Sequence, residues 1–215
     1  MAAKDQSRKK TTKRAKAGDL PARILDTALE LAEETAWAPL KLSEVAARLE
    51  VPLAQVLAHY RDKDAVANAW FGRALAAMLE APPAHFADLP AKERLYLLFL
   101  RWFDALTPHR EVTGQMLREK LHPAHPHHWV PMIFNLSRTI QWLRDAAGLE
   151  ARGRRRQMEE VGLTALFLAT LPVWLADDSP DQARTRDFLR ARLDQADRAM
   201  ARLWAARKDG GEEAS

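Results

Sequence analysis

Apolar residues recur at helical spacing along almost the whole chain, interrupted by short breaks that contain proline or charged residues. No stretch alternates apolar and polar residues over the length of a strand, and β-branched residues are few. The chain is therefore predicted to be all-α. The expected helices span residues 20–36, 43–49, 53–60, 62–80, 92–106, 112–121, 129–147, 152–176 and 179–208.

Breaks in this pattern divide the chain into four parts. Pro82-Pro83 ends one helix and separates a head from a body, because proline cannot continue a helix. Ser179, Pro180 and Gln182 predict the start of the last helix as N-cap, first residue and capping-box residue. The parts are a disordered basic arm at 1–18, a head at 19–80, a body at 84–208 and a disordered polar tail at 209–215.

Composition narrows the class of protein. Of the 215 residues 47% are hydrophobic, which is enough to build a core of one or two domains. There is no cysteine, so disulfides and thiol chemistry are excluded, and the chain suits a reducing cytoplasm. The longest apolar run, Val161–Leu175, is too short to span a bilayer comfortably and contains Pro172. We expect a cytoplasmic protein and no membrane partner.

Positive charge is concentrated at the start of the chain. The formal net charge is +4, yet residues 1–16 alone contain seven basic residues and one acid, so the remainder is mildly acidic. A flexible basic arm of this kind is typical of contact with a polyanion such as DNA, and a solubilising tail is the alternative. The arm residues expected to contact DNA are Lys9, Lys10, Lys13 and Arg14.

The most informative stretch for function is 42–63. Val45, Ala46 and Leu49 mark one face of a short helix, and Pro52 ends it. Two short helices joined by a tight turn form a helix-turn-helix, whose second helix can enter the major groove of DNA. The candidate inward positions of the second helix are Leu53, Val56, Leu57 and Tyr60.

Four local features of this stretch are shared with a known family. They are the pair Val45-Ala46, Val51 in the turn, the pair His59-Tyr60 and the pair Lys63-Asp64. Here the chain resembles the N-terminal domain of TetR-type transcriptional regulators. The resemblance implies a TetR-like fold, with a helix-turn-helix head that binds double-stranded operator DNA. It also implies a helical body that forms a homodimer and binds an apolar small-molecule effector, which in a repressor releases the operator.

The same resemblance implies the residues that contact DNA. Lysine side chains would meet phosphates, and Gln55 could read adenine through two hydrogen bonds. The implied contacts are Lys41, Ser43, Leu53, Gln55, His59, Tyr60 and Lys63.

The head departs from the family pattern at four positions. Pro52 replaces a serine, Ala54 a glycine and Leu57 a tyrosine that commonly binds phosphate. Glu50 replaces a turn glycine and adds negative charge near the DNA. The contact set is therefore poorer than usual, and the basic arm could compensate through phosphate contacts.

A second group of residues lies between about Leu95 and Met200. Its members are Gln115-Met116-Leu117, Leu121-His122-Pro123, Trp142, Ala146-Ala147-Gly148, Asp178-Ser179-Pro180-Asp181, Thr185, Phe188-Leu189 and Arg192. This region resembles the ligand-binding part of TetR-fold ubiquinone-biosynthesis accessory proteins, which bind isoprenoid lipids. The resemblance implies an alternative function, a lipid-binding accessory protein without specific DNA binding.

The body carries aromatic residues that could line an apolar cavity, although core packing is the alternative for each of them. The predicted ligand-binding residues are Phe99, Trp102, Phe103, Met116, Trp129, Phe134, Trp142 and Phe167. By resemblance, the last two helices would form the four-helix bundle of a dimer, with burial inside a monomer as the alternative. The predicted interface residues are Leu163, Phe167, Leu171, Trp174, Phe188 and Leu193.

Histidine is enriched in the connection before residue 129. His122, His125, His127 and His128 could bind a transition metal, and a metal-sensing regulator is a third reading. No cysteine contributes and no HExxH spacing is present, so a solvated loop is favoured and no metal site is predicted.

The remaining charged clusters have simple explanations. Arg155 and Arg156 precede Glu159 and Glu160 by four residues, which predicts ion pairs along a helix. The sequence contains no G-x-S-x-G elbow, Walker loop or dinucleotide fingerprint. The chain is accordingly not predicted to be an enzyme or to need a cofactor.

Overall fold

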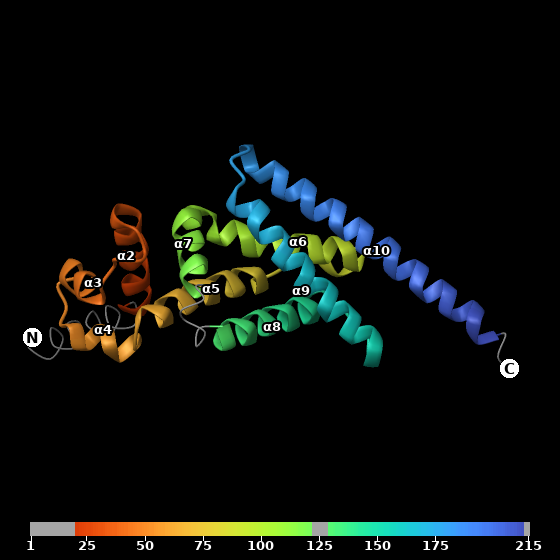
Figure 1. The fold of residues 1–215 in the computed structure, drawn as a ribbon, viewed down its shortest axis with the longest axis horizontal. Helices are drawn as coiled ribbons and strands as arrows, with labels where there is room; N and C mark the ends of the chain where they lie inside the picture. Colours follow the sequence, from red (N-terminus) through yellow and green to blue (C-terminus); the bar gives the residue numbers. More distant parts are fainter. Residues whose placement is uncertain (1–19, 122–128, 213–215) are drawn as a thin grey trace, which may run out of the picture. The chain divides into compact units, whose positions relative to one another are not determined.

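The computed structural model describes residues 20–121 and 129–212. Within these residues the secondary structure is helical with no strand, which confirms the all-α prediction (Figure 1). The chain forms two compact units. Of the described residues, unit 1 contains 20–73 and 109–121, and unit 2 contains 74–108 and 129–212.

Unit 1 is assembled around its first helix. Ile24, Leu25 and Ala28 of this helix are fully or almost fully buried, and α3, α4 and α7 pack against it. Val45 and Val56 are buried with no exposed surface. The helices are α2 (Leu20–Thr35), α3 (Leu42–Arg48), α4 (Leu53–His59), the first part of α5 (Lys63–Leu79) and α7 (Arg110–Lys120).

One helix of unit 1, α7, lies in the part of the sequence that was predicted to belong to the body. Helix α7 was expected within the body at 84–208, but it belongs to unit 1 and buries Val112, Thr113 and Met116 there. An amphipathic pattern shows which face of a helix is buried, but it does not show which element buries it.

Unit 2 is a helical bundle with an aromatic centre. Helix α9 packs against α8 and α10, and α6 packs against the same two helices. Its elements are the second part of α5, η1 (Phe86–Asp88), α6 (Ala91–Leu106), α8 (Trp129–Ala146), α9 (Gly153–Leu175), η4 (Pro180–Gln182) and α10 (Ala183–Glu212). A short helix, η2 (Thr107–His109), follows α6 directly.

The breaks between the first helices have local causes. Helix α2 ends at Thr35, because the next residue, Ala36, has a φ of 81° in the left-handed region that glycine adopts most easily. Glu50 adopts the same region in the turn between α3 and α4, with a φ of 55°. Asp62 caps α5, because its Oδ1 accepts a hydrogen bond from the Ala65 N–H at 2.7 Å.

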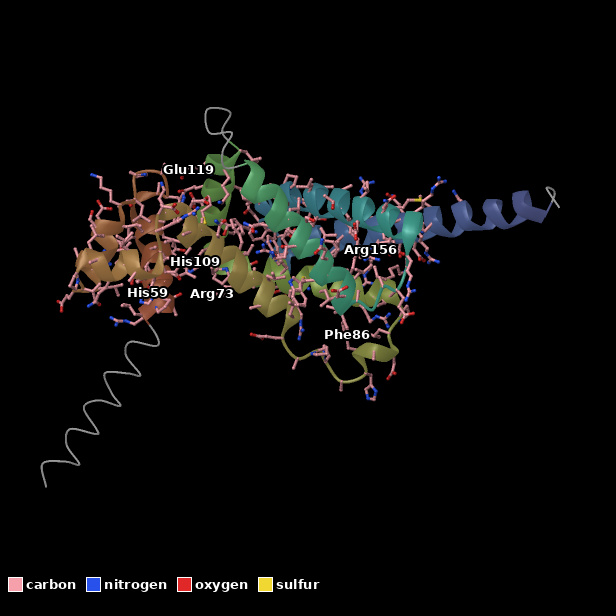
Figure 2. The ribbon with its side chains drawn as sticks, turned by 90° about the horizontal axis from the view of Figure 1, so that it is seen from below. His59, Arg73, Phe86, His109, Glu119 and Arg156 are labelled. Carbon is pink, nitrogen blue, oxygen red and sulfur yellow. The ribbon has the colours of Figure 1, made fainter. Side chains whose placement is uncertain are left out.

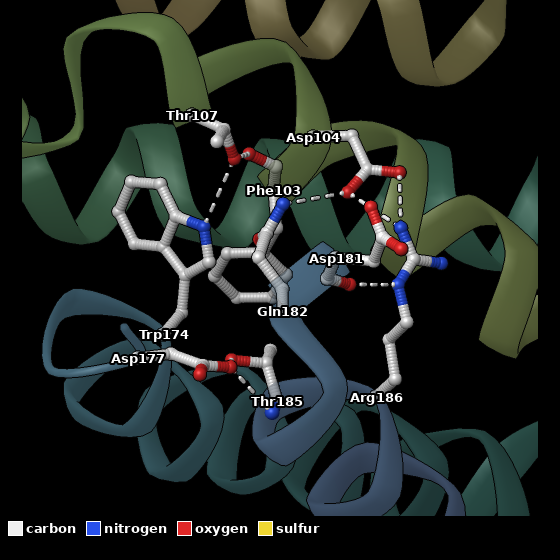
Figure 3. Close-up of polar contacts among 9 residues, drawn as sticks. All are labelled: Phe103, Asp104, Thr107, Trp174, Asp177, Asp181, Gln182, Thr185 and Arg186. Atoms are coloured by element: carbon white, nitrogen blue, oxygen red, sulfur yellow. Dashed lines mark hydrogen bonds and ion pairs between the residues drawn. The ribbon is translucent and has the colours of Figure 1, made fainter. Parts of the chain in front are cut away.

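The start of α10 differs from the predicted capping box. Asp181 and Gln182 have φ values of 51° and 55°, so the α-helix begins only at Ala183, after η4. Ser179 does act as a cap, since its hydroxyl accepts a backbone N–H from the first turn of α10 at 3.1 Å. The Gln182 side chain instead donates to Asp104 at 3.2 Å (Figure 3).

Candidate functional site

The helix-turn-helix of unit 1 is held by backbone hydrogen bonds and a small apolar core. Val51 N–H donates to the Ala46 carbonyl at 3.0 Å and so closes the turn. Glu44 reaches back to accept the Lys41 N–H at 3.1 Å, which secures the first turn of α3. Val56 is the anchor of α4, as its side chain has no exposed surface. This core leaves the rest of α4 facing outward.

The outward side of α4 contains most of the residues expected to read DNA. Leu53 is 51% exposed and Leu57 is 62% exposed, so the expectation that both leucines point inward is wrong. The reason is that a helix of only seven residues buries the one position that faces the core. Gln55 and His59 are exposed as well, and Figure 2 labels His59 at the C-terminal end of α4.

Lys63, expected to contact phosphate, makes contacts inside unit 1. Its Nζ donates to the carbonyl oxygens of Trp37 and Ala38 at 3.1 and 3.0 Å. The same ammonium group forms an ion pair with Glu119 of α7 at 3.1 Å. Lys63 thus links the start of α5 to the segment that follows α2 and to α7. The sequence did not predict this role.

The other expected DNA-contact residues divide into three groups. Lys41 and Ser43 are exposed at the start of α3. Tyr60 donates its hydroxyl to the Pro21 carbonyl at 3.0 Å, and burial raises the pKa of this phenol. The four arm residues lie outside the described part of the chain: Lys9, Lys10, Lys13 and Arg14.

Helix α7 is joined to α2, to the segment after α2 and to α5 by polar contacts that sequence reasoning missed. Trp70 Nε1 donates to the Thr113 hydroxyl at 2.8 Å, and Trp37 N–H donates to Gln115 Oε1 at 2.5 Å. His109, at the N-terminal end of α7, contacts Glu33 of α2 at 2.7 Å (Figure 2). Each pair is separated by more than 40 residues in the chain, so no local pattern could reveal it.

Lys120 of α7 is a buried charged residue. Its ammonium group donates to the Asp64 carboxylate of α5 and to Asn68 Oδ1, the second at 3.1 Å. Asn68 in turn donates to Asp64 at 2.9 Å. The sequence offered one sign of this ion pair. Lys120 lies on the inner face of an amphipathic helix, and a buried charge requires a partner.

In unit 2 the residues predicted to bind a ligand pack mostly on one another. The Trp102 and Phe167 rings lie 4.7 Å apart, and Phe103 and Phe167 stack at 5.7 Å between centroids. Phe99 belongs to the same buried cluster. Met116 is buried in unit 1 and Trp142 is exposed, whereas the side chains of Trp129 and Phe134 lie outside the described part.

A different set of residues lines an apolar groove between α6, α9 and α10, with a volume of about 360 Å³. Its floor is formed by Leu95, Leu163, Leu166, Leu193 and Met200, and its rim carries charged groups. Among the rim residues, Lys92 pairs with Asp194 at 2.7 Å and Arg155 with Glu159 at 3.4 Å. We call this the α6–α9–α10 groove.

A second groove lies between α8 and α9, with a volume of about 460 Å³. It is continuous with an exposed apolar stripe along α9, where Val161 is 70% and Leu168 is 51% exposed. Ala165, Ala169 and Pro172 of the same helix are also exposed. We call Val161, Ala165, Leu168, Ala169 and Pro172 the α9 stripe.

The α9 stripe is not the surface predicted for the dimer. The predicted interface residues divide into the buried side chains Leu163, Phe167, Trp174 and Leu193 and the half-buried side chains Leu171 and Phe188. From Val161 onward helix α9 is apolar on every side, so the sequence could not show which face turns inward. By length and composition alone α9 could also cross a membrane, a test that core helices of soluble proteins pass too.

The arginines at the start of α9 are paired as predicted. Arg155 pairs with Glu159 at 3.4 Å and Arg156 with Glu160 at 2.8 Å (Figure 2 labels Arg156). Buried Arg144 of α8 adds a second contact to Glu159 at 2.9 Å. Among the described residues no group of histidine and acidic side chains could hold a metal, and the loop His122–His128 lies outside them.

A helix-turn-helix head followed by a purely helical second unit is the architecture of a family of transcriptional regulators. The chain is 42% identical to a TetR transcriptional regulator from Nitrosomonas europaea, covering 82% of this chain and 97% of that one with a TM-score of 0.74. The chain therefore belongs to the TetR family of transcriptional regulators. A TetR transcriptional regulator from Rhodococcus sp. RHA1 shares the fold at 21% identity, covering 81% of this chain and 92% of that one with a TM-score of 0.58.

A second family matches a shorter segment. The COQ9 family model matches residues 156–200, which comprise most of α9 and the first part of α10. Comparison with curated protein sequences gave no match.

Proposed function

We propose that this protein is a cytoplasmic, DNA-binding repressor that acts as a homodimer and releases its operator when an apolar small molecule binds. The observation that carries the proposal is the outward side of α4. One buried anchor, Val56, holds this short helix, and its other residues are free of the core. A helix exposed in this way at the second position of a helix-turn-helix can enter a major groove.

Charge around the helix-turn-helix also supports DNA binding. Lys41 is exposed before α3, and the basic arm supplies further positive charge ahead of α2. Exposed lysines bind phosphates as point charges, and several of them steer DNA toward the protein. Lys63 and Tyr60, which are engaged in contacts within unit 1, are assigned to support of the helix-turn-helix in this proposal.

The α9 stripe supports dimer formation. A stripe with such large exposed apolar side chains is typical of a surface that another chain covers. An operator of two related half-sites requires two heads, and a two-fold dimer supplies them. We assign the stripe, in place of the buried residues predicted from the sequence, to contact with the second copy.

The α6–α9–α10 groove is our candidate for the effector site. Its leucine and methionine floor would accept an apolar molecule, and its charged rim would orient a polar end. Binding there would favour one conformation of the dimer over another and so change operator affinity by population shift. No catalytic role is proposed for any residue.

The alternative is a lipid-binding accessory protein. It is favoured by one observation: the residues that α9 and α10 contribute to the groove, from Arg155 to Met200, almost all lie within the segment matched by the COQ9 family. Glu50, Pro52 and Leu57 also make α4 and its turn poor in phosphate contacts. Under this reading the head is a structural remnant.

One experiment separates the two functions. Binding of the full chain to DNA from upstream of its own gene is compared with binding to scrambled DNA over a salt series. Selective binding near physiological salt supports the repressor. Equal binding to both DNAs that collapses as salt rises means that only the basic arm acts, and it rejects the operator proposal.

A variant sharpens this test. Gln55→Ala should weaken selective binding while dimer formation stays unchanged, because Gln55 is exposed on α4. Gln195→Ala, the same change at an exposed site on α10, is the matched control and should bind as the wild type does. If Gln55→Ala has no effect, and organic extraction of the purified protein yields a lipid, the accessory function is favoured.

A further inference from the structure

Two exposed leucines on α4 are the least expected feature of unit 1. Leu53 and Leu57 are large apolar side chains, yet each exposes more than half of its surface to water. Neither is needed for the core, since Val56 is the buried residue of α4. Their positions four residues apart place them side by side on one flank of the helix.

The helix-turn-helix geometry gives α4 three distinct strips. At roughly 100° of rotation per residue, Ala54 and Ala58 point directly away from the Val56 anchor. Leu53 and Leu57 form one flank of this centre, and Gln55 and His59 form the other flank. All six side chains are exposed. The surface therefore has a short, apolar centre, an apolar flank and a hydrogen-bonding flank.

We propose that this surface reads A·T base pairs, with Leu53 and Leu57 contacting thymine methyl groups and Gln55 reading adenine. The inference rests on the proposed DNA-binding function and adds the class of sequence that is bound. In the major groove thymine alone among the four bases presents a methyl group, and adenine presents the donor and acceptor pair that a glutamine matches. The alanine centre lets the backbone of α4 approach the base edges closely.

The composition of α4 disfavours guanine. Arginine and lysine make the commonest specific contacts to guanine, and residues 53–59 contain neither. A cytosine would place no methyl group against the leucine flank. A G·C-rich half-site would thus leave both flanks without their complementary partners.

A protein partner is the competing occupant of the leucine flank. Two leucines and two alanines on a helix of seven residues offer far less than the roughly 800 Å² per partner of a standard protein interface. The exposed cation Lys41 and the basic arm favour a polyanion nearby. We therefore assign the surface to DNA.

The test begins with selection of duplexes by the full-length protein from a random library. Enriched half-sites rich in A·T are then remade with deoxyuridine in place of each thymine, which removes the methyl group and leaves pairing intact. Removing a methyl group that contacts a leucine should raise the Kd roughly three- to fivefold. This factor corresponds to the free energy of burying one apolar carbon.

Matched variants show whether the leucines carry this effect. In Leu57→Ala and in Leu53→Ala the loss caused by deoxyuridine should shrink by the roughly three- to fivefold share of the leucine that is removed, whereas in Gln55→Ala the whole loss should persist while adenine preference falls. Both leucines are exposed, so the wild-type thermal unfolding curve should be retained.

The outcomes distinguish this inference from the function on which it rests. If duplexes are selected but are G·C-rich, or if deoxyuridine has the same effect in wild type and in Leu57→Ala, methyl readout is rejected and the repressor stands. If no sequence is enriched over the starting library, both proposals fail. Loss of binding to a co-purified protein in Leu57→Ala, with DNA binding unchanged, would reassign the flank to a protein partner.

Discussion

Thr185 donates two hydrogen bonds to one carboxylate oxygen of Asp177, from its backbone N–H at 2.7 Å and from its hydroxyl at 2.6 Å (Figure 3). The other oxygen accepts the Ser179 N–H at 3.0 Å and the Ser179 hydroxyl. Asp177 is almost fully buried. One carboxylate thus holds the left-handed turn that joins α9 to α10.

Replacing this carboxylate should destabilise unit 2 in a way that depends on pH. Burial alone would raise the pKa of Asp177, but the hydrogen bonds from Ser179 and Thr185 outweigh it and hold the pKa well below its ordinary value. The stabilisation is therefore complete above the unfolded-state pKa of about 3.9 and is lost as pH falls below it. We expect Asp177→Asn to cost about 1–3 kcal/mol at neutral pH.

Urea unfolding from about pH 7 down to about pH 3 measures this dependence. The difference in unfolding free energy between wild type and Asp177→Asn should shrink as the pH falls. Asp187→Asn is the matched control, because Asp187 is exposed on α10. A difference that stays constant with pH would show that the turn depends on shape and not on the charge of Asp177.

The buried ion pair of Lys120 and Asp64 should be important for unit 1. Lys120→Met removes the positive charge of the pair, while Asp64 keeps the hydrogen bond that it accepts from Asn68 at 2.9 Å. We expect the free energy of unfolding to fall by about 3–5 kcal/mol, because the buried Asp64 carboxylate then lacks the opposite charge of Lys120. Adding Asp64→Asn to Lys120→Met should recover part of this loss, which thermal unfolding of the single and double variants measures.

The exposed pair of Arg48 and Glu34 is the control for Lys120. Its charged atoms are 2.8 Å apart, but both side chains are about half exposed. Solvent screens such a pair, so Arg48→Met should leave the unfolding temperature nearly unchanged. Equal effects of Arg48→Met and Lys120→Met would contradict the importance given to burial.

Glu50 combines backbone strain with negative charge near the proposed DNA surface. Glu50→Gln removes the charge alone, and Glu50→Gly also relieves the left-handed φ of 55°. Both variants should bind DNA more tightly at low salt, whereas only Glu50→Gly should gain stability, by about 1 kcal/mol. Fluorescence anisotropy with a DNA duplex and a thermal unfolding curve for each variant separate the two effects.

Several features of the fold were predictable because their causes are local. Asp62 precedes an apolar-periodic stretch, and it caps α5 through the backbone three residues later. Arg155 and Arg156 find their acids one helical turn away. The helix-turn-helix was recognisable from spacing and from Pro52, which ends the turn and serves as N-cap of α4.

Other features depend on partners that are distant in the chain. Lys120 finds Asp64 across 56 residues, and nothing near either residue indicates the other. Leu53 and Leu57 fit an inward pattern, but α4 is too short to bury more than Val56. The turn after Asp177 places two non-glycine residues in left-handed conformations, which a capping-box pattern does not predict.

The α9 stripe provides the last prediction, which concerns assembly. Leu168→Glu would place a carboxylate at the centre of the proposed dimer surface, where a buried charge without a partner is strongly unfavourable. We expect the dimer dissociation constant to rise on the order of 100-fold or more, because loss of a few kcal/mol corresponds to such a change. Light scattering after size-exclusion chromatography, over a range of concentrations, measures it.

A matched variant tests whether the position or the charge is responsible. Leu121 of unit 1 is 54% exposed, close to the 51% of Leu168, so Leu121→Glu makes the same chemical change at an equally open site. Leu121→Glu should leave the dimer intact, while Leu168→Glu should yield folded monomers that lose selective binding to a two-half-site operator. A dimeric Leu168→Glu would move the interface away from the α9 stripe.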